Sequence, residues 1–136
     1  MTDNDIDKLI AAGAYQSVIH GLVERVAELE RRLRWDPDEL PSRVAELERR
    51  LAPDVRRIRY TLGEDHGGDP AVFFRVLLSD SACRGARLFP LTKHVESEIV
   101  AYLGLDRPGV GAPLPYPYFN FRSESEQAQL KEESWE

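Results

Sequence analysis

The chain has 136 residues, which is enough for one ordinary domain or for a small domain with a helical arm. Its net charge of -6 argues against non-specific binding to nucleic acid or anionic lipid. One cysteine excludes an intramolecular disulfide and a cysteine-rich zinc site. The acidic N-terminus is unlike a signal peptide, and no apolar run approaches the length of a membrane span. We therefore expect a cytoplasmic protein with no membrane partner.

An internal repeat marks the first part of the chain. The octapeptide Val-Ala-Glu-Leu-Glu-Arg-Arg-Leu stands at 26–33 and again, 18 residues later, at 44–51. Between the copies, Asp36 suits a helix N-cap and Pro37 suits the first helical position, so a second helix is predicted to begin there. We assign residues 1–55 to a helical arm that contains the repeat and residues 56–136 to a small α+β domain.

The first predicted helix carries a narrow apolar seam. Its members recur at alternating steps of four and three residues, as in a coiled coil: Tyr15, Ile19, Leu22, Val26, Leu29 and Leu33. In one interpretation Val44, Leu47 and Leu51 cover this seam within the chain, forming a helical hairpin. In the other, the seam joins two copies of the chain. We favour self-association, and both arrangements together would give a four-helix dimer interface.

Beyond residue 55 the apolar pattern changes from helical spacing to alternation. Residues 56–62 and 72–78 are typical of two strands, and the glycine-rich loop between them predicts a β-hairpin. An amphipathic helix over 91–103 follows, and Gly104 is a typical C-terminal stop.

The last part of the chain predicts one more strand and one more helix. Residues 118–122 alternate like a short strand, and Ser123 with Glu126 forms the sequence pattern of a capping box for a helix that ends at Trp135. The predicted fold class is therefore α+β: a helical hairpin or short coiled coil, then a three-stranded sheet. The domain follows the order β-hairpin, helix, strand, helix, with the helices packed on one face of the sheet.

The hairpin loop is the segment densest in groups that bind cations. Glu64, Asp65, His66 and Asp69 supply carboxylate and imidazole groups within six residues, which suits a divalent metal ion. These are also ordinary residues of a hairpin loop. We predict no cofactor, with a divalent cation at this loop as the alternative.

Two further sets of residues are candidates for binding a macromolecule. Tyr116 and Tyr118 lie in a proline-rich stretch, where they either form a docking surface for a partner or fill the core. Arg57 and Arg59 share the outer face of the first strand, and with Arg75 they form a candidate nucleic-acid stripe. Residues 56–122 carry 9 basic and 7 acidic side chains, a net charge of +2, so the acidic total is carried by the two ends.

The sequence lacks the common motifs of nucleotide-binding and hydrolytic enzymes. It predicts a non-enzymatic protein-interaction and oligomerisation module with a protein partner. Such a module suits a small accessory or regulatory subunit, for example the antitoxin-like half of a two-protein system. The alternative is a small nucleic-acid-binding or metal-dependent enzyme that uses the 64–69 loop.

Overall fold

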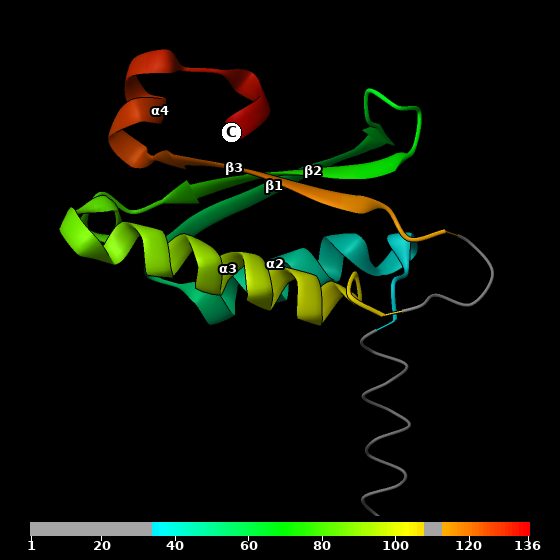
Figure 1. Cartoon of the computed structure of the whole chain (residues 1–136). Helices are drawn as coiled ribbons and strands as arrows, with labels where there is room; N and C mark the ends of the chain where they lie inside the picture. The colour runs from blue at the N-terminus through cyan, green and yellow to red at the C-terminus, as the bar shows by residue number, and fades with distance from the viewer. Residues whose placement is uncertain (1–33, 108–112) are drawn as a thin grey trace, which may run out of the picture. The chain divides into compact units, whose positions relative to one another are not determined.

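The computed structural model describes residues 34–107 and 113–136 (Figure 1). In these residues a three-stranded mixed sheet is combined with three α-helices, which confirms the predicted α+β class. None of these helices is long and apolar enough to cross a membrane.

Helix α2 (Leu40–Leu51) follows a short 3-10 turn, η1 (Pro37–Glu39). Asp36 caps that turn by accepting a hydrogen bond from the amide of Asp38 at 3.0 Å. The predicted cap thus forms at the turn, whereas the N-cap of α2 itself is Glu39, which makes no side-chain cap bond. Leu40, Val44 and Leu47 lie on one face of α2 and are buried in the core that includes the sheet. The second copy of the repeat therefore belongs to the compact unit Arg34–Glu136, although the sequence groups it with the arm.

The sheet has the strand order β1-β2-β3. Strands β1 (Val55–Glu64) and β2 (Pro70–Leu78) form the predicted antiparallel hairpin. Strand β3 (Tyr116–Ser123) runs parallel to β2, since the chain returns through helix α3 (Leu88–Leu103) before it pairs. Gly104 ends α3 in the left-handed conformation, with φ 75°, as its position predicted. Strands β1 and β3 are thus the two edges of the sheet.

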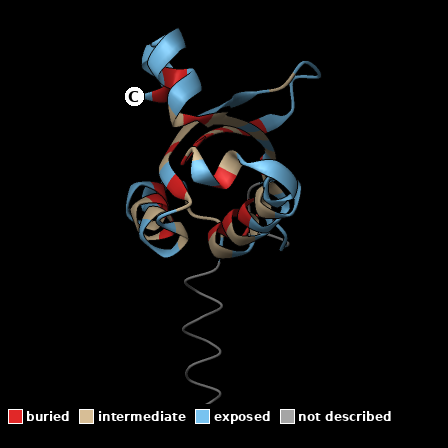
Figure 2. Cartoon of the chain, turned by 90° about the vertical axis from the view of Figure 1, so that its left-hand side faces the viewer, coloured by how far each residue is buried: buried red, intermediate tan, exposed pale blue. Residues whose placement is uncertain are grey.

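The hydrophobic core lies between the sheet and helices α2 and α3 (Figure 2). Strand β2 is its centre, because Val72, Phe74 and Val76 are all completely buried. Val95 and Ile99 of α3 pack against them with the apolar face of α2. We call this the core face of the sheet and the opposite one the open face.

Helix α4 (Glu124–Leu130) and the 3-10 turn η4 (Glu133–Trp135) pack on the open face, as Figure 1 shows. The expectation that all helices pack on one face is therefore wrong for this segment. Leu77 and Trp135, both nearly buried, explain the difference, because an apolar side chain on the open face needs cover. The capping box of α4 is confirmed, but the helix ends at Leu130 because Lys131 adopts φ 53°.

Candidate functional site

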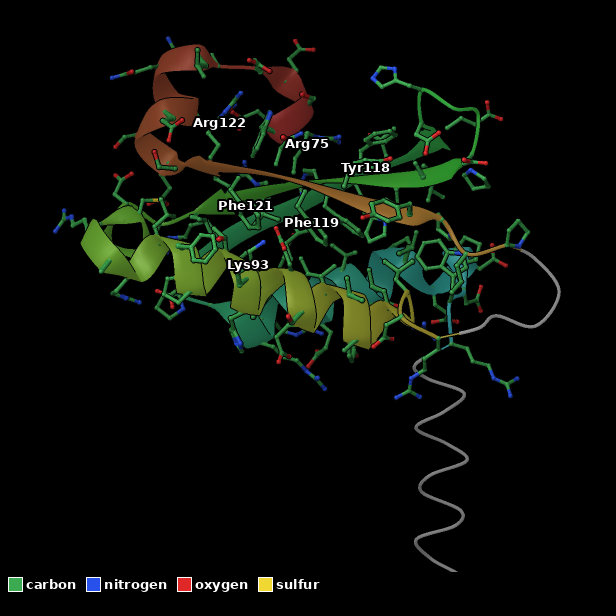
Figure 3. The ribbon with its side chains drawn as sticks, in the orientation of Figure 1. Arg75, Lys93, Tyr118, Phe119, Phe121 and Arg122 are labelled. Carbon is green, nitrogen blue, oxygen red and sulfur yellow. The ribbon has the colours of Figure 1, made fainter. Side chains whose placement is uncertain are left out.

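Strand β3 alternates between the two faces of the sheet. Phe119 and Phe121 pack against the core on the side of α3, whereas Tyr118 lies on the open face (Figure 3). Tyr116 shares that face because it stands two residues before Tyr118. The exposed fractions are 62% for Tyr116 and 38% for Tyr118. The two predicted docking residues therefore lie together at the surface.

Phe73 of β2 completes an aromatic surface, which we define as Phe73, Tyr116 and Tyr118. Phe73 is paired in register with Tyr118, and their rings stack with centroids 5.3 Å apart. The rings of Tyr116 and Tyr118 are 5.0 Å apart and tilted by 56°. Such close ring contacts hold the three side chains in place, and Tyr116 remains the most exposed of them.

An open groove of about 520 Å³ runs between the free edge of β3 and α3. Its lining combines four residues of β3 with one turn of the helix: Tyr116, Pro117, Tyr118, Phe119, Glu96, Ser97 and Val100. We call it the β3 groove. Among the described residues, the recorded hydrogen bonds of the β3 backbone go to β2 and, at Ser123, to the cap of α4. The edge of the strand that borders the groove is therefore open to further pairing.

At the opposite edge of the sheet, a side chain of α2 binds the backbone of β1. The amide of Ile58 in β1 donates a hydrogen bond at 3.0 Å to the carboxylate of Glu48. The same carboxylate lies 3.6 Å from the guanidinium of Arg59. A helix side chain thus satisfies a backbone group that an added strand would need, and β1 is a poorer template than β3.

The 64–69 loop is held together by Asp65. One carboxylate oxygen of Asp65 accepts hydrogen bonds from the amides of Gly67 and Asp69 at 2.9 and 3.0 Å, and the other accepts one from the Tyr118 hydroxyl at 3.2 Å. These bonds, that from the Asp69 amide above all, lower the pKa of Asp65. Burial and the adjacent Asp65 carboxylate raise the pKa of Tyr118.

Glu64, Asp65, His66 and Asp69 are the four candidate metal ligands. In the described part of the chain, no three His, Cys, Asp or Glu side chains are grouped so that they could hold a metal ion. Both carboxylate oxygens of Asp65 are already engaged, one by amides of the turn and the other by the Tyr118 hydroxyl. The hydrogen bond between Asp65 and Tyr118 joins this loop to the aromatic surface.

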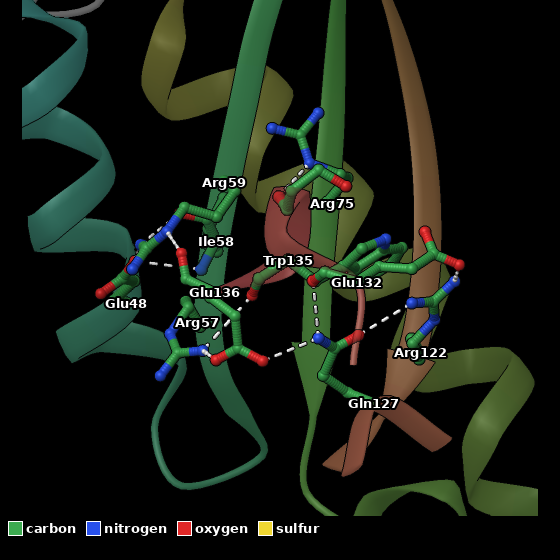
Figure 4. A network of polar contacts seen from close by, with 11 residues as sticks. Glu48, Arg57, Ile58, Arg59, Arg75, Arg122, Gln127, Glu132, Trp135 and Glu136 are labelled. Carbon is green, nitrogen blue, oxygen red and sulfur yellow. Dashed lines mark hydrogen bonds and ion pairs between the residues drawn. The ribbon is translucent and has the colours of Figure 1, made fainter. Parts of the chain in front are cut away.

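The arginines of the candidate nucleic-acid stripe are brought together on the open face (Figure 4). Arg75 donates to the carbonyl of Ser134 at 2.6 Å, and Arg59 donates to the main-chain oxygen of Glu136 at 2.6 Å. Arg57 lies 3.2 Å from the Glu136 carboxylate. A ligand for these guanidinium groups would compete with the segment 132–136 for their hydrogen bonds.

A fourth arginine ties the same segment to β3. The guanidinium of Arg122 lies 4.3 Å from the centre of the Trp135 ring and donates hydrogen bonds to Gln127 and Glu132. Gln127 also donates to the Glu136 carboxylate at 2.8 Å, and this bond, with help from Arg57, lowers the pKa of Glu136. We call these contacts the arginine network: Arg57, Arg59, Arg75, Arg122 and the residues of 127–136 that they bind.

Several residues of these surfaces were missed by the sequence analysis. Phe73 was not named as a candidate, although strict alternation with Phe74 in the strand predicted over 72–78 places the two side chains on opposite faces. The arginine network depends on residues far apart in the chain: Arg75 and Ser134 are separated by 59 positions. No local pattern predicts such a pairing.

The thiol and the histidines form no catalytic grouping in the described residues. Burial, with smaller effects of Glu126 and Asp80, raises the pKa of the Cys83 thiol. His66 and His94 are both exposed on separate elements. The six predicted self-association residues lie outside the described residues: Tyr15, Ile19, Leu22, Val26, Leu29 and Leu33.

No protein-family model matches the chain, and no curated protein or solved structure matches it. The function is therefore argued from the surfaces described above.

Proposed function

We propose that this protein is a non-enzymatic interaction module in which one region joins copies of the chain and another docks a partner protein. The self-association seam is the predicted short coiled coil of Tyr15, Ile19, Leu22, Val26, Leu29 and Leu33. The β3 groove and the aromatic surface accept an extended segment of the partner, which adds a strand to the sheet. In this role the protein is a small accessory or regulatory subunit in the cytoplasm.

The observation that carries the docking proposal is the edge of β3, which has no strand partner within 34–107 and 113–136 and lies beside a groove with exposed aromatic rings. Soluble proteins usually blunt an exposed sheet edge with charges, prolines or a covering segment. Here β3 contains one proline, Pro117, and one charged residue, Arg122, whose guanidinium is bound by Gln127 and Glu132. Tyr116 and Tyr118 stand along the same strand. Aromatic side chains of this kind are enriched where proteins bind one another, because they bury much area at a small cost in entropy.

The self-association proposal is tested by measuring the mass of the full chain in solution. Light scattering should give a dimer or a larger assembly. The double substitution Leu22→Asp and Leu29→Asp places charges in the apolar seam and should give a monomer with an unchanged circular dichroism signal from the body. An unchanged mass would contradict the proposal.

The docking proposal is tested by selecting binders from a display library of random peptides against the full chain. Binders from this library should lose affinity when Tyr116→Ala removes one ring of the aromatic surface. Phe89→Ala is the matched control, since Phe89 is 71% exposed and is not among the residues that line the β3 groove. If the selected peptides bind Tyr116→Ala as well as the unaltered chain, β3 is not the docking edge.

A further inference from the structure

We infer that the segment docked at β3 is basic: an extended strand that presents lysine or arginine side chains to the aromatic surface. This inference rests on the proposed function, because it names the chemistry of the partner at the same edge. It follows from the charges that surround the aromatic surface and from the geometry of strand addition.

Acidic groups surround the exposed rings. The Asp65 carboxylate binds the Tyr118 hydroxyl directly, and the negative charges of Asp65 and Asp69 both act on Tyr118. On the other side of the strand edge, Glu96 stands in the wall of the β3 groove. Its carboxylate lies 3.6 Å from the ammonium group of Lys93, a surface ion pair that water screens strongly. An acidic partner would be repelled from this edge, whereas a basic one is attracted.

The rings themselves favour a cation. The face of a tyrosine or phenylalanine ring attracts an ammonium or guanidinium group that lies within about 6 Å of its centre. Three such contacts occur elsewhere in the described residues: Arg50 over Tyr102 at 4.5 Å, Arg122 over Trp135 at 4.3 Å and Lys93 over Phe89 at 5.5 Å. Among the described residues, no such contact is recorded for Phe73, Tyr116 or Tyr118.

The arginines on the open face form their contacts at the end of that face away from the aromatic surface. Arg75 is the nearest of them along β2, two positions from Phe73, and its guanidinium binds Thr61 at 2.9 Å and Ser134 at 2.6 Å. The remaining members of the arginine network bind residues of 127–136. In the described part of the chain these arginines are thus held away from the aromatic surface, and we assign its cation to a partner.

Strand geometry sets the spacing of the basic residues. In a strand added to β3, every second side chain faces the same side of the sheet, about 7 Å apart. Tyr116 and Tyr118 have this spacing on the open face, while Phe119 and the α3 residues of the groove lie on the core side. The partner thus alternates: basic side chains toward the aromatic surface, and apolar side chains toward Val100 and the groove.

The test uses three synthetic peptides of about ten residues, the length of a typical long strand. The first alternates valine with arginine, the second replaces arginine by the neutral analogue citrulline, and the third replaces it by glutamate. Binding to the full chain is measured by isothermal titration calorimetry at low and at physiological ionic strength. We expect the arginine peptide to bind best, with a loss of roughly three- to fivefold for each arginine exchanged for citrulline. Its affinity should fall as salt is added.

Four variants locate the interaction. Tyr116→Ala and Asp69→Asn should each weaken binding of the arginine peptide. Phe89→Ala and Glu133→Gln are the matched controls: the first removes an exposed aromatic ring and the second an exposed negative charge, and neither residue belongs to the aromatic surface, the 64–69 loop or the lining of the β3 groove. Neither control should change the affinity.

The outcomes separate the inference from the proposed function. If the arginine and citrulline peptides bind equally well and both depend on Tyr116, strand docking stands and the basic specificity is wrong. If the glutamate peptide binds best, the arginine network is the binding site and the inference is overturned. If no peptide depends on Tyr116, both the inference and the docking proposal are wrong.

Discussion

The two ends of the open face differ in one respect: the chain covers one of them and leaves the other exposed. At the arginine end, the segment 132–136 brings main-chain carbonyls, the Glu136 carboxylate and the nearly buried Trp135 onto four guanidinium groups. At the aromatic end, Tyr116 and Tyr118 keep much of their surface in water. The guanidinium groups at the arginine end are bound by residues of the same chain, whereas the aromatic rings at the other end remain exposed. That contrast is why we place docking at β3.

The largest expected effect comes from removing the cover of the arginine end. Trp135 is only 6% exposed, so Trp135→Ala should lower the free energy of unfolding by roughly 3 kcal/mol. Tyr116→Ala, at the exposed aromatic end, should change it by less than about 0.5 kcal/mol. Urea unfolding of the two variants measures both values. Equal losses would mean that the two ends do not differ in packing, which contradicts the comparison.

A smaller effect is expected from a single arginine of the network. Arg75→Met keeps an unbranched apolar side chain but loses the hydrogen bonds to Ser134 and Thr61, which should cost about 1 kcal/mol. Amide hydrogen exchange should become faster in 132–136 and stay the same in β3. Arg84→Met is the control, because Arg84 is exposed and its side chain makes no recorded hydrogen bond to another described residue. Faster exchange in β3 instead would show that the two ends are coupled.

Acid should loosen the two ends through different carboxylates. Folding lowers the pKa of Asp65, so its ionised form stabilises the fold above the unfolded pKa, and this contribution is lost as pH falls below about 4 toward the folded pKa. Glu136 behaves in the same way at the arginine end, where Gln127 and Arg57 lower its pKa. Asp65→Asn should therefore remove the acid sensitivity of the hairpin loop alone.

This third prediction is measured by the exchange of the Gly67 and Asp69 amides between neutral and acidic pH. In the unaltered chain their protection should fall with acid, and in Asp65→Asn it should be lower at neutral pH and nearly independent of pH. The amide of Glu136 should keep its acid response in the variant. A loop that remains acid-sensitive without Asp65 would show that another group holds the turn.

Local signals in the sequence predicted much of the fold. Asp36 caps a turn, Gly104 ends a helix and Ser123 forms a capping box, because each of these devices needs only neighbouring residues. The face covered by α4 could not be predicted in this way, since it depends on the packing of α4 and η4 against β2, which is distant in the sequence. The end of α4 at Leu130 was missed because the next residue, Lys131, adopts the left-handed conformation, which is uncommon for lysine.

The candidate site was predicted in part. The proline-rich sequence pointed to Tyr116 and Tyr118, and alternation required that both face the same side, but nothing in it decides between the core and the surface. Phe73 and the β3 groove follow only from the parallel pairing of β2 with β3. The stripe of Arg57, Arg59 and Arg75 was predicted as a shared face, yet its partner is the chain's own segment 132–136.

The most direct test of the comparison is a residue-resolved nuclear magnetic resonance titration of the full chain with the valine–arginine peptide. We expect amide signals of β3, from Tyr116 to Phe121, to shift and their exchange with solvent to slow, while the signals of 132–136 stay in place. Shifts confined to 132–136 and the arginine network, with β3 unchanged, would contradict the claim that the uncovered aromatic end is the docking surface.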